Sequence, residues 1–227
     1  MGIEPDDVSL DPPRVTSRLD RLFERYPQLS PLKGSVQSAY ETIRDAYRRG
    51  GKLLVCGNGG SCADAQHIVG ELMKGFYLKR PLPDGEQSAL AKAFGDGGEE
   101  LAGMMQGALP AIALGEHAAL NTAFANDVDA SLMFAQQVIG YGRPGDALLS
   151  ISTSGGSLNV LRAAQAARAR GLRVIALTGG DGGKLASIAD TAIIVPASIT
   201  AQVQEYHLPI YHTLCAMLEE RFFGRGD

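Results

Sequence analysis

Five short apolar runs, separated by segments with helical spacing, constrain the fold of this chain more than any other feature. The runs cover residues 52–56, 109–114, 147–152, 173–178 and 191–195. Continuously apolar runs of this length are typical of parallel strands buried on both faces, with helices as the connections between them. The sequence therefore predicts an α/β fold, a doubly wound and mostly parallel five-stranded sheet flanked by helices.

Helical segments also precede the first apolar run and follow the last one. Apolar residues at helical spacing predict a helix over about 12–26 and a second over about 30–49. A long C-terminal helix is expected over about 200–223. Pro209 lies inside it and should kink it, because proline lacks the backbone N–H that the helix needs.

Residues 82–107 break the alternation of strands and helices. Glycines are mixed there with helix formers such as those at 89–93, so we expect a partly helical insertion on the surface. A tolerated insertion and a lid or partner surface both remain open as interpretations. We divide the chain into an N-terminal helical extension, residues 1–29, and one domain, residues 30–227, which contains this insertion.

A glycine turn directly after the first apolar run predicts an anion site. The run leads through Gly57-Asn58-Gly59-Gly60-Ser61 into a helix, and a helix start of this kind presents backbone N–H groups to an anionic oxygen. The same helix carries His67 and Glu71, which lie four residues apart and therefore share one face. One histidine on a helix is usually a core residue, but a carboxylate beside it favours a metal or proton-transfer site.

A second polar segment follows the apolar run 147–152. It reads Ser152-Thr153-Ser154-Gly155-Gly156-Ser157 and opens a helix that extends to Arg170. One hydroxyl at a helix start is explained by capping alone. Four hydroxyls in six residues, at the carboxyl end of a predicted strand, favour a phosphate ligand instead.

The remaining polar candidates leave alternatives open. In the C-terminal helix Gln204 and His207 share a face, while His212 lies about 80° to the other side, so spacing does not choose between the histidines. Asn126-Asp127 follows a predicted helix that ends near residue 125. That pair is interpreted as a turn, although it could also reach a sugar hydroxyl.

Composition excludes several classes of function. The formal net charge of −4 argues against a nucleic-acid partner, which requires a basic face. No apolar run approaches the ~20 residues of a membrane span, and the acidic start lacks the features of a signal peptide. Three scattered cysteines do not make a disulfide framework, so we expect a cytoplasmic protein.

The polar segments together resemble the sugar-isomerase (SIS) superfamily, and most closely its phosphoheptose isomerases. The resemblance is carried by the glycine turn with His67 and Glu71, by Asn126-Asp127, by the Ser152–Ser157 segment, and by Gln204-Glu205-Tyr206-His207 running on to His212. It covers roughly residues 30–223 apart from the insertion. Three departures are Lys74 near the place of a usual arginine, Gly156 in place of a usual asparagine, and the insertion itself.

The resemblance implies a ligand set. It implies one zinc ion per subunit, held by His67, Glu71, Gln204 and His212. It implies that the substrate phosphate is bound by Ser61, Ser152, Thr153, Ser154 and Ser157. It further implies that the sugar is lined by Asn58, Gly59, Gly60, Asn126 and Asp127, with Glu71 and Gln204 also in contact with it.

The activity implied is an aldose–ketose isomerisation of sedoheptulose 7-phosphate to D-glycero-D-manno-heptose 7-phosphate through an enediol or enediolate. Glu71 is then the candidate base and His212 the candidate acid. The implied assembly is a homotetramer with active sites between subunits. Two alternatives are an isomerase of another sugar phosphate and a non-catalytic SIS protein that binds a sugar phosphate or a protein partner.

Overall fold

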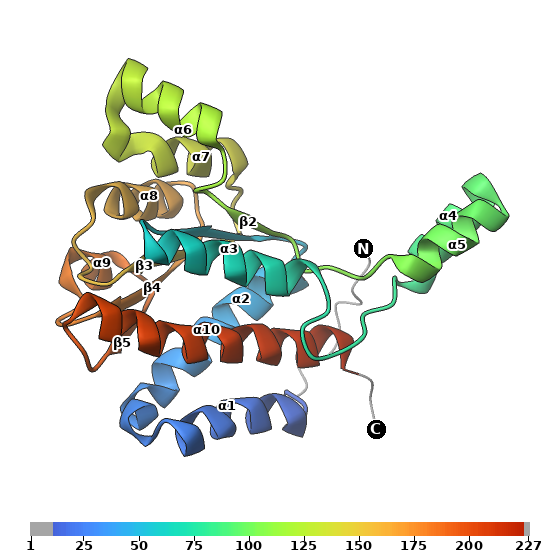
Figure 1. Cartoon of the computed structure of the whole chain (residues 1–227), viewed down its shortest axis with the longest axis horizontal. Coiled ribbons are helices and arrows are strands. Elements are labelled where there is room, and N and C mark those ends of the chain that lie inside the picture. The colour runs from blue at the N-terminus through green and yellow to red at the C-terminus, as the bar shows by residue number, and fades with distance from the viewer. Residues whose placement is uncertain (1–10, 225–227) are drawn as a thin grey trace.

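The core of the molecule is one parallel β-sheet, as the apolar runs predict. The computed structural model describes residues 11–224. The sheet has the order β2-β1-β3-β4-β5, and every neighbouring pair is parallel (Figure 1). The strands are β1 (Leu53–Cys56), β2 (Ala111–Ala113), β3 (Ala147–Ser152), β4 (Arg173–Gly179) and β5 (Thr191–Val195).

Helices cover both faces of this sheet, which confirms the predicted doubly wound architecture. The helices are α1 (Pro13–Arg25), α2 (Lys33–Arg48), α3 (Gly60–Met73), α4 (Asp84–Phe94), α5 (Asp96–Met104), α6 (Ala118–Phe124), α7 (Met133–Tyr141), α8 (Leu158–Ala169), α9 (Gly183–Ile188) and α10 (Thr200–Phe223). Three shorter turns of helix are a 3-10 segment, Pro27–Leu32, a π-helical segment, Ala125–Asp129, and a 3-10 segment, Ala130–Leu132. Within residues 11–224, no helix is long and apolar enough to cross a membrane.

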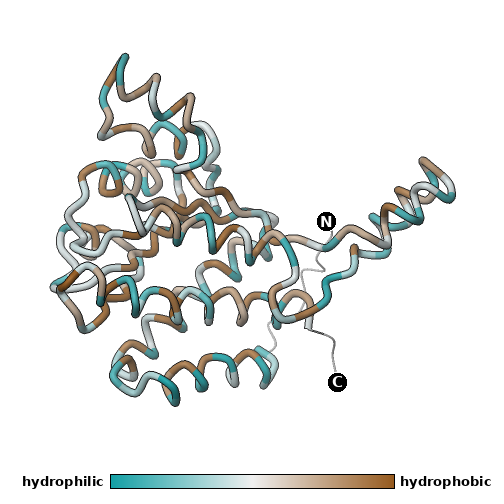
Figure 2. Tube along the Cα trace, viewed as in Figure 1, coloured by the Kyte–Doolittle hydropathy of each residue, from teal (hydrophilic) through white to brown (hydrophobic). Residues whose placement is uncertain are grey.

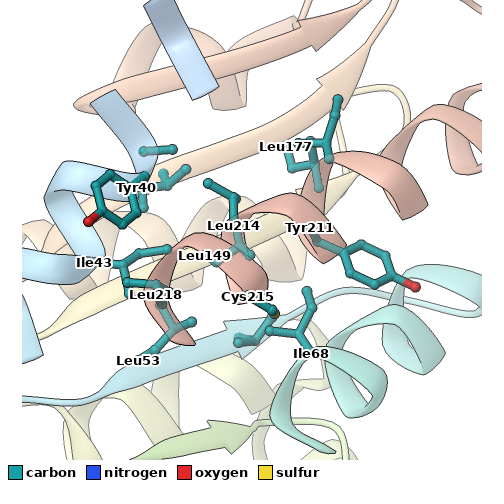
Figure 3. Close-up of a cluster of buried hydrophobic side chains, with 14 of the residues drawn as sticks. Tyr40, Ile43, Leu53, Ile68, Leu149, Leu177, Tyr211, Leu214, Cys215 and Leu218 are labelled. Carbon is teal, nitrogen blue, oxygen red and sulfur yellow. The ribbon is translucent and has the colours of Figure 1, made fainter. Parts of the chain in front are cut away.

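Successive residues of each strand point to opposite faces of the sheet and pack in two separate apolar clusters. On β1, Leu53 and Val55 join the cluster formed with α1, α2, α3 and α10, while Leu54 joins the cluster formed with α7, α8 and α9. Figure 2 shows the strands as apolar segments inside the molecule, and Figure 3 shows part of the first cluster. Each fully buried leucine or isoleucine contributes roughly 1.5–3 kcal/mol, which is why continuously apolar strands specify this layered fold.

The strand order creates a switch point beside β1. The chain leaves β1 toward β2 on one side of the sheet and later returns to β3 on the other side. The register pairs Cys56 of β1 with Ser150 of β3, so their carboxyl ends lie next to each other. Connections diverge at such a point and leave a crevice at the carboxyl edge, where ligands bind in open α/β sheets.

The N-terminal helices belong to the same core as the sheet. Val15, Leu19 and Leu22 of α1 are buried in the cluster that also contains β1 and α10, and α1 lies alongside α10 (Figure 1). The first ten residues of the predicted 1–29 extension lie outside the described residues. The described part of that extension thus packs with the domain and shares its core.

The insertion at 82–107 forms a helical hairpin that projects from the body of the molecule. Its helices, α4 and α5, pack against each other and extend away from the sheet (Figure 1). Phe94 is 70% exposed and Met104 is 67% exposed. This part of the chain is thus helical, with large apolar side chains on its surface.

Two local expectations require correction or qualification. Asn126 and Asp127 do not form a turn, because the chain continues from α6 into the π-helical segment Ala125–Asp129. The α10 helix runs without interruption through Pro209 from Thr200 to Phe223. Packing of α10 against α1, α2 and α3 holds it as one helix despite the missing N–H.

A buried ion pair joins the ends of α3 and α10. Nε of Arg80 lies 2.7 Å from Oε1 of Glu219, and both side chains are 0% exposed. Glu219 also accepts hydrogen bonds from the backbone N–H groups of residues 76, 77 and 78. Arg80 donates to the carbonyls of Glu71 and Leu72 at the C-terminal end of α3, where a cation is favourable.

We expect Glu219→Leu to destabilise the fold strongly. The change leaves the Arg80 charge buried without a counter-ion and removes the acceptor of three backbone N–H groups, so the free energy of unfolding should fall by about 3–5 kcal/mol. Asp20→Asn, which breaks the exposed Lys33–Asp20 pair at 2.7 Å, should cost less than about 1 kcal/mol. Urea unfolding at one fixed protein concentration tests both variants, and equal losses would contradict this role of the buried pair.

Candidate functional site

The predicted phosphate segment lies at the carboxyl end of β3, on the switch-point edge of the sheet. Ser152 is buried, and its hydroxyl donates to the hydroxyl of Ser157 at 3.1 Å. The hydroxyl of Ser154, which is exposed, accepts from the N–H of Gly156 at 3.2 Å. The segment is thus a compact turn before α8, with hydroxyl and N–H groups at the start of that helix.

Two glycines of this segment differ sharply in their surroundings. Gly155 has φ +62°, and a Cβ atom there would collide with the carbonyl oxygen of Gly182. A Cβ on Gly156 would meet only the Ser154 hydroxyl, at 3.5 Å. Position 155 therefore requires glycine, whereas position 156 has room for a Cβ atom.

The glycine turn after β1 lies beside the phosphate segment. Asn58 and Asn159 of α8 exchange two amide hydrogen bonds of 2.8 Å, which ties the two segments together. Asn58, Gly59 and Gly60 are exposed, whereas Ser61 is only 3% exposed. The turn therefore presents mainly backbone groups and an amide at the carboxyl edge of the sheet.

Gln204 lies at the same edge. Its side-chain amide packs against Gly60, close to the position that a Cβ atom on Gly60 would occupy. Val203 packs in the same way against Gly179 at the end of β4. The start of α10 therefore covers the carboxyl edge next to the glycine turn.

The side chains of His67, Glu71 and His212 form a second cluster farther along α3 and α10. Nε2 of His67 lies 3.2 Å from Oε1 of Glu71 and 3.4 Å from Nε2 of His212. His67 lies seven residues beyond Gly60, which corresponds to ~10 Å along the helix. The structure thus brings together three of the four predicted zinc ligands and places Gln204 with the glycine turn instead.

Two distances in this cluster resemble those around a zinc ion. Donor atoms bound to a tetrahedral zinc at about 2.1 Å lie about 3.4 Å from one another, and the distances from Nε2 of His67, 3.2 Å to Glu71 and 3.4 Å to His212, are close to this value. Partial burial, and then the nearby His67 ring, lower the pKa of His212, which favours the neutral ring that a metal requires. Within residues 11–224, however, no group of three or more His, Cys, Asp or Glu side chains is placed so that it could hold a metal ion.

The structure separates the two histidines between which the sequence could not choose. His207 is 0% exposed, and burial lowers its pKa to about 4. His212 lies beside His67, with ring centroids 4.8 Å apart. His212 is therefore in position to act with His67, and His207 is a core residue.

Asn126 and Asp127 do not join either cluster in this chain. Both are exposed, and the amide of Asn126 donates to the carboxylate of Asp127 at 2.8 Å. Within the described part of the chain, no hydrogen bond or ion pair links either residue to another predicted site residue.

Two contacts of the cluster were missed by the sequence analysis. Nζ of Lys74 lies 2.9 Å from Oε2 of Glu71, so that the two carboxylate oxygens of Glu71 face different partners. The Tyr211 hydroxyl lies 3.0 Å from Nδ1 of His67. The position of Lys74 three residues after Glu71 was a usable signal, whereas the contact of Tyr211 depends on how α10 packs on α3.

One cavity includes a residue of these clusters, and a larger one does not. His212 lines a cavity of about 610 Å³ together with Tyr77 and three arginines of α1, Arg18, Arg21 and Arg25. A larger cavity, of about 1080 Å³, lies between α1 and α2 and contains none of the predicted site residues. The candidate site is therefore defined by its chemical groups, and a larger hollow lies elsewhere.

Known proteins resemble this chain over most of its length. The SIS domain family matches residues 19–92 and 88–179. Phosphoheptose isomerases of Rhodospirillum rubrum and Geobacter sp. strain M21 are each 40% identical, over 85% and 88% of this chain and 89% of their own lengths. Solved phosphoheptose isomerases from Neisseria gonorrhoeae and Francisella tularensis are each 32% identical, with TM-scores of 0.69 and 0.72. The matches cover 92% of this chain and 98% and 97% of those chains.

We expect Gly155→Ala and Gly156→Ala to behave in opposite ways. The first forces a Cβ into the Gly182 carbonyl at a positive φ, so it should lower the free energy of unfolding by more than about 1 kcal/mol. The second has space and should change it by less than about 1 kcal/mol. Chemical denaturation measures both, and a tolerated Gly155→Ala would show that the segment adopts another backbone conformation.

Proposed function

This chain belongs to the phosphoheptose isomerase family of SIS-domain proteins, and we propose that its site interconverts sedoheptulose 7-phosphate and D-glycero-D-manno-heptose 7-phosphate. The observation that carries the proposal is the placement of the His67–Glu71–His212 cluster about two helical turns from an anion-binding edge. A phosphate at one end and proton-transfer groups at the other suit a long sugar phosphate that is held in an extended form.

The phosphate end uses the segment Ser152–Ser157 and the start of α3. Hydroxyl groups and backbone N–H groups at two helix starts stabilise an anion without any nearby lysine or arginine being required. In this proposal Ser61, Ser152, Thr153, Ser154 and Ser157 hold the phosphate. Asn58, Gly59, Gly60 and Gln204 then lie between the phosphate and the reacting carbons.

The chemical step moves a proton between C1 and C2. Glu71 removes the proton from the carbon beside the carbonyl, and His212 supplies a proton to the carbonyl oxygen, which gives the enediol. Glu71 then gives its proton to the former carbonyl carbon, and the hydroxyl on the neighbouring carbon returns a proton to His212. These two transfers complete the isomerisation. Because Oε1 of Glu71 faces His67 and Oε2 faces Lys74, one oxygen is available to hold a metal while the other moves the proton.

Zinc fits this proposal as the cofactor. His67, Glu71 and His212 would hold it through two ring nitrogens and one carboxylate oxygen, and Gln204 would need to move from Gly60 to become the fourth ligand. When bound, zinc polarises a carbonyl and stabilises the negative charge of an enediolate.

A homotetramer with active sites between subunits is part of the same proposal. The His67 side chain is 44% exposed in one chain, and within residues 11–224 no hydrogen bond or ion pair joins Asn126 or Asp127 to the clusters. These features are those of a site that a neighbouring subunit completes. The three free cysteines support the proposed location in a reducing cytoplasm.

The direct test is incubation with sedoheptulose 7-phosphate followed by identification of the product. We expect Glu71→Gln to lower turnover by at least ~10², because a positioned base is lost while the side chain keeps its shape. Glu24→Gln, at an exposed position on α1, is the control and should keep normal turnover. Near-normal turnover of Glu71→Gln would reject Glu71 as the base.

The same assay separates the two alternatives. Binding of the sugar phosphate with no turnover by the wild-type protein would indicate a non-catalytic SIS protein. Faster turnover of a different ketose or aldose phosphate would indicate another isomerase of the family.

Metal dependence gives an independent prediction. A strong chelator should abolish activity, added zinc should restore it, and His212→Ala should lose the metal because a ring donor is removed. His117→Ala, at an exposed histidine bonded to Tyr141, should keep it. Metal analysis of the purified proteins decides the assignment, and full zinc occupancy in His212→Ala would exclude His212 as a ligand.

A further inference from the structure

The hydroxyl of Tyr211 has a position that the mechanism above does not use. Its oxygen lies 3.0 Å from Nδ1 of His67 and 3.3 Å from Oδ1 of Asp64. Tyr211 is 1% exposed. Figure 3 shows the ring at the margin of the apolar cluster, with the hydroxyl directed toward α3. The phenol therefore connects α10 to two residues that lie one turn apart on α3.

A phenol keeps its proton at neutral pH, so Tyr211 has one proton for two neighbours. A carboxylate can only accept, and a hydrogen bond to a charged acceptor is stronger than one to a neutral ring nitrogen. The other oxygen of Asp64, Oδ2, is buried with no hydrogen-bond partner within the described residues. We therefore expect the Tyr211 hydroxyl to donate its hydrogen bond to Asp64 and not to His67.

Once Tyr211 donates to Asp64, its oxygen can only accept from His67. Nδ1 of His67 must then carry the ring proton, and Nε2 must carry the lone pair. Nε2 is the atom that lies 3.2 Å from Glu71 and 3.4 Å from His212. The lone pair thus faces the point that these three side chains share.

We propose that Tyr211, held by Asp64, is a positioning residue that fixes His67 in the tautomer with the proton on Nδ1. The use of the Nε2 lone pair as a metal ligand rests on the proposed function, but the tautomer does not. The opposite arrangement has Tyr211 donating to Nδ1 and Nε2 donating to Glu71. It would give Glu71 a hydrogen bond from Nε2, but it would leave Asp64 without its bond from Tyr211. Glu71 already has Lys74 at 2.9 Å, whereas the Oδ2 atom of Asp64 has no partner within the described residues, so the loss at Asp64 is the larger one.

The tautomer is measured directly by two-bond ¹H–¹⁵N correlation spectra of the histidine rings in the metal-free full-length protein. The chain has four histidines, and His67→Gln identifies the His67 signals. At a pH where the ring is neutral, we expect the Nδ1–H pattern in the wild type and a shift toward Nε2–H in Tyr211→Phe. An Nε2–H pattern in the wild type, or an unchanged pattern in Tyr211→Phe, would overturn the inference.

Tyr47→Phe is the matched control. Tyr47 is also a buried tyrosine on α2, but its hydroxyl has no hydrogen-bond partner among the residues that the structure describes. Its removal should leave the His67 pattern unchanged. Asp64→Asn is a second variant that keeps the shape of the side chain and removes the charge, and it should shift the tautomer in the same direction as Tyr211→Phe.

Zinc affinity provides the second readout, by competition with a chelator of known strength. Loss of a group that orients a metal-binding histidine typically weakens the metal by about 10- to 100-fold, and we expect this for Tyr211→Phe but not for Tyr47→Phe. Wild-type protein that binds no zinc would reject the metal part of the proposed function and leave the tautomer result standing. Normal zinc binding with equal affinity in Tyr211→Phe would reject the role of Tyr211.

Discussion

The arrangement of the site depends on the buried pair of Arg80 and Glu219. Arg80 neutralises the C-terminal end of α3, and Glu219 holds Arg80 and the backbone after α3 against α10. Gly60 at the start of α3 contacts Gln204 near the start of α10, and His67 farther along α3 contacts His212 farther along α10. The helices therefore run parallel, and the ion pair secures the end of that alignment. Two fully desolvated charges are stable only because every strong donor and acceptor around them is satisfied.

The sheet edge and the two parallel helices supply different groups to the site. The carboxyl edge at the β1/β3 switch point supplies hydroxyl and backbone groups that suit an anion. The facing sides of α3 and α10 supply titratable groups about two turns away. A rigid sheet fixes the first set and the paired helices fix the second, so the distance between them follows from the helical rise. A long sugar phosphate needs such a fixed separation between its phosphate and its reacting carbons.

The strands and most helices were predictable because their signals are local. Strands 147–152 and 191–195 and the helix 200–223 match the structure at both ends. The Asn126-Asp127 pair was not predictable in the same way. Those residues favour turns by chemistry, yet the helical path of α6 continues through them as a π-helical segment. In the site, His67 and Glu71 could be paired from their spacing alone, because four residues along a helix fix their geometry.

The sequence by itself determined the layered fold, the two polar segments at strand ends and the facing of His67 with Glu71. Periodicity and turn chemistry act over a few residues, and these features need no more than that. Only the tertiary structure decided that His212 and not His207 meets His67, that Gln204 lies against Gly60, and that Tyr211 joins Asp64 to His67. Those contacts join residues more than 140 positions apart. They depend on the rotation and offset of α10 against α3, which long-range packing sets.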